Sequence, residues 1–192
     1  MTLLLAFLLL LLTVPAAGGR LGRLEGLHLR LVWLAVLAVA AQLLIMVVVP
    51  EGDTAVHRVA HLWTYGLVGA CVIWNLDVRF MWVVAVGGLL NLIAIGVNGG
   101  VMPASRGALD RAGLGVHDGS FTNSDLVEGA NLAFLGDVFA IPEGWPAANV
   151  FSAGDVVLLL GALLVLHAAT GSRLVAAPRT AHPRAQGSPA AR

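Results

Sequence analysis

The sequence contains no lysine, a single cysteine and few charged residues of any kind, which make up 11% of its 192 residues. An average soluble domain carries roughly 25% charged residues, so this composition argues against a soluble globular protein. There is no run of basic residues, and the formal net charge is zero, so we expect no nucleic-acid partner. The one cysteine, Cys71, allows neither an intramolecular disulfide nor a metal site built from thiolates.

Apolar residues dominate instead, because 58% of the chain is hydrophobic and its mean hydropathy is +0.88. A helix of about 20 residues, at roughly 1.5 Å per residue, matches the hydrocarbon core of a bilayer. The sequence therefore predicts an all-α fold, a polytopic transmembrane helix bundle that forms one domain over residues 1–170. The expected spans are residues 1–17, 31–50, 59–76, 80–97 and 150–170.

Basic residues in short loops prefer the cytoplasmic side of a membrane, and their distribution predicts the orientation. Eight arginines fall on one predicted side and three on the other, which places the N-terminus outside and the C-terminus inside. Residues 98–149 then form one long extracytoplasmic loop, and residues 171–192 form a disordered cytoplasmic tail. Every basic residue is arginine, which suggests GC-rich codons, so we expect a multi-pass protein of the bacterial plasma (inner) membrane.

The first apolar segment fits two interpretations, a retained helix and a cleaved signal peptide. A secretory signal begins with positive charge, whereas no charged residue precedes Arg20 in this sequence. The sequence therefore favours the retained helix.

Polar side chains inside an apolar span are costly unless they are partnered, so each marks a packing contact or a site. Asn91 lies near the middle of the fourth span and fits either an amide contact between helices or a binding residue. The same span ends in Asn98-Gly99-Gly100, which is typical of a helix C-cap but also allows a ligand to approach the backbone. All four are kept as candidate binding residues.

His57 and His61 lie four residues apart, so they share one helix face and could hold a metal together. The residues that could complete such a site are Glu51, Asp53 and His117. Catalytic zinc motifs place a glutamate next to the first histidine, whereas here that neighbour is the cation Arg58. We therefore favour interfacial hydrogen bonding for this pair and expect no metal and no cofactor.

A carboxylate, Asp155, stands at the start of the last span within Ser152-Ala153-Gly154-Asp155. This pattern is typical of a capping box, in which the hydroxyl caps the first turn and the acid bonds back to the cap residue. A carboxylate inside a bilayer must also be neutralised or find a donor, which favours a site. The two interpretations are compatible, so Ser152 is a candidate binding residue and Asp155 a candidate site residue. His167, near the other end of this span, is expected to interact with the helix C-terminus.

These segments resemble an uncharacterised family of bacterial five-span membrane proteins, a domain of unknown function. The resemblance rests on residues 91–103, on Leu135-Gly136-Asp137-Val138 with the following Ile141-Pro142, and on residues 152–155. It covers nearly the whole chain except the tail.

Residues 151–155 are also similar to the motif that opens the last span of lipoprotein signal peptidases and carries one of their two catalytic aspartates. Residues 87–94 resemble the other motif, but Ala94 stands where the second aspartate is expected. An aspartyl mechanism needs two carboxylates around one water, so only Asp137 could replace the missing acid.

Two functions from different classes follow from these observations. The first is a non-enzymatic module that binds a membrane lipid or a lipid-linked peptide, or a subunit that joins a partner membrane protein, with a polar site at the outer helix ends. The alternative is an outward-facing intramembrane hydrolase that resembles lipoprotein signal peptidase and uses Asp155 and Asp137 as its catalytic pair. Whether the protein is an enzyme stays open at this point.

Overall fold

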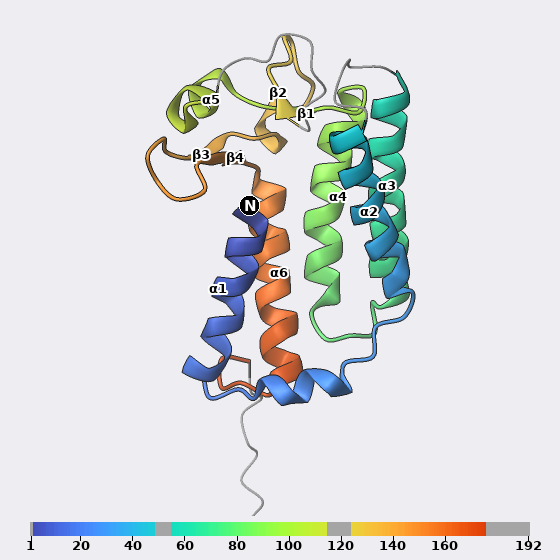
Figure 1. Cartoon of the computed structure of the whole chain (residues 1–192), viewed down its shortest axis with the longest axis vertical. Coiled ribbons are helices and arrows are strands. Elements are labelled where there is room, and N and C mark those ends of the chain that lie inside the picture. The colour runs from blue at the N-terminus through green and yellow to red at the C-terminus, as the bar shows by residue number, and fades with distance from the viewer. Residues whose placement is uncertain (1, 49–54, 115–123, 176–192) are drawn as a thin grey trace, which may run out of the picture.

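The computed structural model describes residues 2–48, 55–114 and 124–175. Its long helices run side by side, and a smaller folded region covers one end of them (Figure 1). These helices are α1 (Thr2–Ala16), α2 (Val32–Val48), α3 (Ala55–Trp74), α4 (Met81–Val97) and α6 (Ala153–Thr170). A short 3-10 helix, η1 (Leu21–Gly26), follows α1. The predicted mostly helical fold is therefore confirmed.

The two central helices, α4 and α6, pack closely because glycines replace side chains at their contact. A Cβ atom at Gly87 would lie 2.6 Å from the backbone nitrogen of Leu158, and one at Gly161 would lie 2.7 Å from that of Val84. A Cβ atom at Gly154 would collide with the side-chain amide of Asn91. Small residues of this kind allow helix backbones to approach each other.

A partly buried polar contact joins the helix α1 to α6. The Thr13 hydroxyl lies 2.9 Å from Nε2 of His167, and Nδ1 of the same ring lies 2.6 Å from the Ser172 hydroxyl. His167 and Ser172 are fully buried. The predicted tail, residues 171–192, therefore starts as a packed segment, and its residues 176–192 lie outside the described part of the chain.

The predicted outer loop, residues 98–149, is a folded cap in the parts that the structure describes. It contains α5 (Arg106–Ala112), a 3-10 turn η2 (Ala133–Leu135) and two small sheets. In the first sheet β1 (Met102–Pro103) pairs in parallel with β2 (Ser124–Asp125), and in the second β3 (Phe139–Ile141) pairs antiparallel with β4 (Asn149–Phe151). The all-α prediction is too narrow here, because strands of two or three residues are too short to show a period in the sequence.

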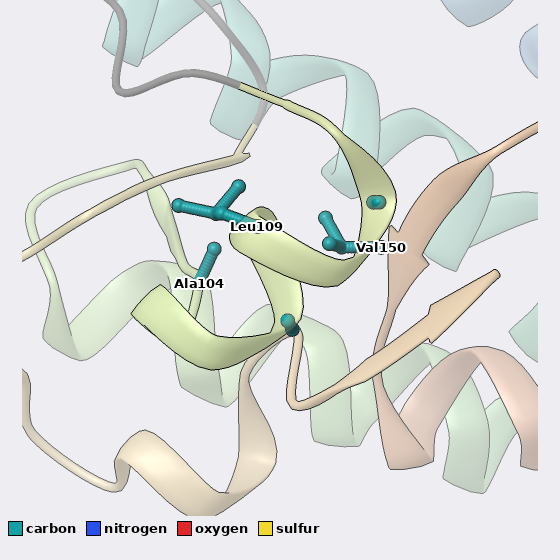
Figure 2. Close-up of a cluster of buried hydrophobic side chains, with 5 residues drawn as sticks. Ala104, Leu109 and Val150 are labelled. Carbon is teal, nitrogen blue, oxygen red and sulfur yellow. The ribbon is translucent and has the colours of Figure 1, made fainter. Parts of the chain in front are cut away.

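The cap has its own small hydrophobic core beneath α5. Ala104, Leu109 and Val150 meet there, together with Ala108 and Ala112 of the same helix (Figure 2). The Ser105 hydroxyl caps α5 by accepting a hydrogen bond from the backbone N–H of Ala108. Because β4 leads directly into α6, this core fixes the cap over the start of that helix.

One described helix, α6, is long and apolar enough to cross a membrane by length and composition. The apolar helix α4 and the stretch Val32–Leu44 of α2 are shorter. Large apolar side chains nevertheless cover the outside of the helices, and Leu12, Val36 and Trp63 are each more than half exposed. Exposed apolar surface of this extent marks an interaction with a membrane or with another protein.

Candidate functional site

The start of α6 is joined to the middle of α4 by a closed hydrogen-bond network. Asn91 Nδ2 donates to Asp155 Oδ1 (2.7 Å), and the Ser152 hydroxyl donates to Asn91 Oδ1 (2.8 Å). The capping box is complete, because the backbone N–H of Ser152 donates to Asp155 Oδ2 (3.0 Å) and the N–H of Asp155 donates to the Ser152 hydroxyl (3.0 Å). Asn91 and Ser152 are buried, at 2% and 0% exposure. Ser152 and Asp155 therefore form the expected capping box, and Asn91 makes the expected amide contact between helices.

Asp137 belongs to the cap, and its side chain lies near this hydrogen-bond network. Its backbone N–H donates to the carbonyl of Pro103 (2.9 Å), and its carbonyl accepts from the N–H of Ser105 (3.0 Å). The preceding Gly136 is required at this contact, because a Cβ atom there would collide with the Pro103 carbonyl oxygen. These contacts hold the Asp137 side chain in the interior, where it is only 3% exposed.

The buried environment changes the acidity of Asp137. Burial raises the pKa of its carboxyl from 3.8 to about 6, the negative charge of Asp155 adds to the rise, and a hydrogen bond with Ser124 opposes it. Asp137 and Asp155 are thus close enough to interact electrostatically, as the sequence-based pairing requires. Their proposed roles as site residues stay predictions.

Tyr65 of α3 completes this polar group, and sequence reasoning did not include it in the site. Its phenol interacts electrostatically with both Asp155 and Asp137. Its ring also makes an edge-to-face contact with the His61 ring, with centroids 5.2 Å apart. The only signal in the sequence is its place one helical turn beyond His61, which says nothing about contacts with α6 or the cap. We call Tyr65, Asn91, Asp137, Ser152 and Asp155 the outer polar site.

Ala94, at the position where signal peptidases have their second aspartate, is fully buried. It packs with Ile95 and Met102, and Tyr65 and Leu135 lie against the same cluster. An acid at this position would lie in an apolar setting. Asp137, two residues beyond Leu135, reaches the outer polar site from the cap instead.

An apolar groove of about 190 Å³ lies between α3 and α4. Several of its lining side chains are also exposed at the surface, among them Val68, Ile73 and Leu89, so the groove opens sideways between the helices. Tyr65 is its polar member. The full lining consists of Tyr65, Val68, Gly69, Val72 and Ile73 of α3, Val84, Ala85, Gly88, Leu89 and Leu92 of α4, and Leu158 of α6.

The groove and the outer polar site are adjacent. Leu158 lines the groove, and Asp155 lies three residues earlier on α6, on the same side of the helix. On α4, the lining residue Gly88 lies three residues before Asn91, on the same side of that helix. Tyr65 belongs to both features. A long molecule lying in the groove would therefore end at the two carboxylates.

The end of α4 holds the cap in place. Asn98 Nδ2 donates to the carbonyls of Ala94 (2.7 Å) and Asn131 (2.8 Å), and Asn98 Oδ1 accepts from the N–H of Asn131 (2.8 Å). Gly100 has a φ of 94°, and a Cβ atom there would lie 2.9 Å from the Cβ of Arg58. Gly99 also has a positive φ of 71° and faces Arg58. At Gly99 and Gly100 the backbone therefore lies close to α3. The proposed role of these glycines in binding a ligand stays a prediction.

Of the two histidines proposed as a metal pair, the structure describes the side chain of His61, whereas that of His57 lies outside the described side chains. His61 is buried, and its Nδ1 lies 3.0 Å from Nε2 of Gln42 on α2. Thr64 donates to the other side-chain atom of that amide, Oε1, at 3.2 Å. Among the described residues, no group of three His, Cys, Asp or Glu side chains could hold a metal. Three of the candidate ligands, Glu51, Asp53 and His117, lie outside the part of the chain that the structure describes.

Comparison with known proteins places this architecture in a family. The model of DUF5317, a family of unknown function, matches residues 26–167, which include α2 to α4, the cap and most of α6. The chain therefore belongs to the DUF5317 family, and the sequence-based assignment to an uncharacterised family is confirmed. No curated protein and no solved structure matches the chain.

Proposed function

We propose that this protein is a multi-pass protein of the bacterial plasma membrane that binds a membrane lipid, or a lipid-linked peptide, between α3 and α4. In this arrangement α1, α2, α3, α4 and α6 each cross the bilayer, with the N-terminus outside, the C-terminus inside and the cap outside. Reporter fusions test this topology, because a periplasmic reporter placed after Gly113 of the cap is expected to be active and one placed after Asp77 inactive.

The observation that carries the proposal is the continuity of the groove with the outer polar site through Tyr65. A lipid has the same division into an apolar chain and a polar head. An apolar cavity of 150 Å³ in a protein interior can hold benzene, so a groove of about 190 Å³ has room for a segment of acyl chain. Pockets that combine an apolar lining with a few convergent polar groups are the usual form of a small-molecule site.

Filling the groove tests the binding. A Cβ atom at Gly88 meets no atom within 4 Å, so Gly88→Leu adds its side chain to the groove without a backbone clash. Gly96→Leu is a matched control on the same helix, since Gly96 has equal space but does not line the groove. Native mass spectrometry of the purified variants is expected to show lipid bound to the wild type and to Gly96→Leu but not to Gly88→Leu. Equal lipid occupancy in all three would contradict the proposal.

A second candidate, an intramembrane aspartyl hydrolase, is favoured by the unequal environments of the two acids. An acid–base pair needs one carboxyl that keeps its proton near neutral pH and one that stays ionised. Burial raises the pKa of Asp137 to about 6, which is the direction expected of the carboxyl that carries the proton. Asn91 and the Ser152 backbone take one acceptor position on each oxygen of Asp155, so a catalytic water would have to use the remaining positions.

Incubation with a fluorescent lipid-linked peptide separates the two candidates. The hydrolase predicts cleavage by the wild type that Asp137→Asn and Asp155→Asn each abolish, while Asp110→Asn on α5 retains it. Binding of the lipopeptide without cleavage would reject the hydrolase and support the binding module.

A further inference from the structure

We infer that the groove selects a phospholipid whose headgroup ends in a primary ammonium, with an acyl chain between α3 and α4 and the ammonium against the partly exposed carboxylate of Asp155, where the buried charge of Asp137 adds to the attraction. The inference rests on the lipid binding proposed above and names the class of ligand. It follows from the construction of the groove, from its position relative to the two acids, and from the charge of those acids.

Two glycines on facing helices line the groove. Gly69 on α3 and Gly88 on α4 both line it, and a Cβ atom at either would meet no atom within 4 Å. Gly87, which directly precedes Gly88, is in contrast required for contact with α6. Gly66 and Gly96 also relieve no clash, so what distinguishes Gly69 and Gly88 is their place in the lining of the groove. At Gly69 and Gly88 the missing side chain is what gives the groove its depth.

The polar end of the groove is preorganised around Asp155. Asn91 and the Ser152 backbone hold its carboxylate with one hydrogen bond to each oxygen. A carboxylate offers about four acceptor positions, so each oxygen of Asp155 can accept a further donor. Asp155 is also only partly buried, whereas its two partners are buried, so the open side of the carboxylate is the side that a ligand can reach.

The negative charge at the polar end of the groove favours a cationic ligand. Within the part of the chain that the structure describes, no basic side chain forms an ion pair with Asp155 or Asp137. Two carboxylates that interact with each other and have no ion-pair partner among the described residues attract a positive group. A primary ammonium carries three N–H donors, which suits the open acceptor positions of Asp155. A choline headgroup has the charge but no donor, and a glycerol headgroup leaves the lipid anionic.

A lipid competition experiment tests this selectivity. The full-length protein is equilibrated in detergent with equal amounts of dioleoyl phosphatidylethanolamine, phosphatidylcholine and phosphatidylglycerol, and bound lipids are identified by native mass spectrometry. We expect phosphatidylethanolamine to exceed phosphatidylcholine about tenfold, the ratio that one charge-assisted hydrogen bond supplies, with phosphatidylglycerol last. The variant Asp137→Asn/Asp155→Asn is expected to bring the first ratio close to one without lowering the total bound lipid. Asp110→Asn, which removes one carboxylate at an exposed position of α5 and so matches the single variant Asp137→Asn, is expected to leave the ratio unchanged.

The outcomes distinguish selectivity for the ammonium headgroup from lipid binding itself. Lipid that is lost in Gly88→Leu but shows no headgroup preference in the wild type would overturn the inference and leave the groove as a lipid site. A preference for phosphatidylglycerol, or a preference that survives in the double variant, would also overturn it. Absence of any lipid from the wild type would overturn both. Asp137→Asn alone leaves the capping box of α6 intact and is expected to lower the ratio of phosphatidylethanolamine to phosphatidylcholine by itself. A folding defect in the double variant therefore does not remove the test.

Discussion

Removal of the charge at Asp137 is expected to stabilise the folded protein near neutral pH. The carboxyl has a pKa of about 6 in the folded chain against 3.8 as its ordinary value. The folded state therefore holds the proton more tightly than the unfolded state. The stability that this group contributes is fully present below about pH 4 and is lost as the pH rises through 6. A shift of this size corresponds to up to about 3 kcal/mol.

Asp137→Asn keeps the shape of the side chain and its ability to accept a hydrogen bond from Ser124, but it cannot ionise. We expect its free energy of unfolding to exceed that of the wild type by about 2–3 kcal/mol at pH 7.5 and to differ by less than about 1 kcal/mol at pH 4.5. For a chain of this length this is a rise in melting temperature of roughly 5–10 °C at the higher pH.

Thermal unfolding of the purified protein in detergent, followed by tryptophan fluorescence at both pH values, measures this difference. Asp110→Asn is the matched control, because the Asp110 side chain is exposed on α5 and its substitution is expected to change stability by less than about 0.5 kcal/mol. Two results would refute the claim that burial raises the pKa of the Asp137 carboxyl. One is a lower melting temperature for Asp137→Asn at both pH values, and the other is a difference from the wild type that does not depend on pH.

Four further substitutions test contacts of the helix bundle, and each is measured by the same unfolding assay. Asp155→Asn is expected to destabilise by about 1–2 kcal/mol at pH 7.5, the opposite sign to Asp137→Asn, because an amide loses one of the two accepted hydrogen bonds and the charge at the helix N-terminus; equal stability would count against the capping role. Gly154→Ala is expected to cost more than about 2 kcal/mol because its Cβ collides with Asn91, whereas Gly88→Ala, with open space, is expected to be tolerated; a similar loss in both would contradict the packing argument. Thr13→Val is expected to cost about 1–2 kcal/mol because it leaves the buried Nε2 of His167 without its partner; no change would mean that this contact does not fasten α1 to α6.

Composition and hydropathy were sufficient to predict the helical part of the fold. The segments expected at residues 80–97 and 150–170 correspond to α4, Met81–Val97, and α6, Ala153–Thr170. The start of α6 was predictable because a capping box is a local pattern of four residues, Ser152 to Asp155. The cap was not, since its strands are short and its pairing depends on contacts between distant residues such as Phe139 and Phe151.

The site itself was only partly predictable for the same reason. A polar residue in an apolar span, such as Asn91, can be found from sequence, but its partner Asp155 is 64 residues away. The sequence does not distinguish Gly87, which packs against α6, from Gly88, which opens onto the groove, although they are neighbours. The groove and the role of Tyr65 in it depend on which face each helix presents, and the nearly uniform hydrophobicity of these helices leaves that face unspecified.

Photo-crosslinking tests the central claim, a lipid held between α3 and α4, most directly. The protein is reconstituted with phosphatidylethanolamine that carries a diazirine in its acyl chain, irradiated, and digested for peptide mapping. We predict crosslinks concentrated on Val68, Leu89, Leu92 and Leu158, and their loss in Gly88→Leu but not in Gly96→Leu. Labelling of these residues at the same level as exposed Val36 and Leu44 of α2, unchanged by Gly88→Leu, would contradict the claim.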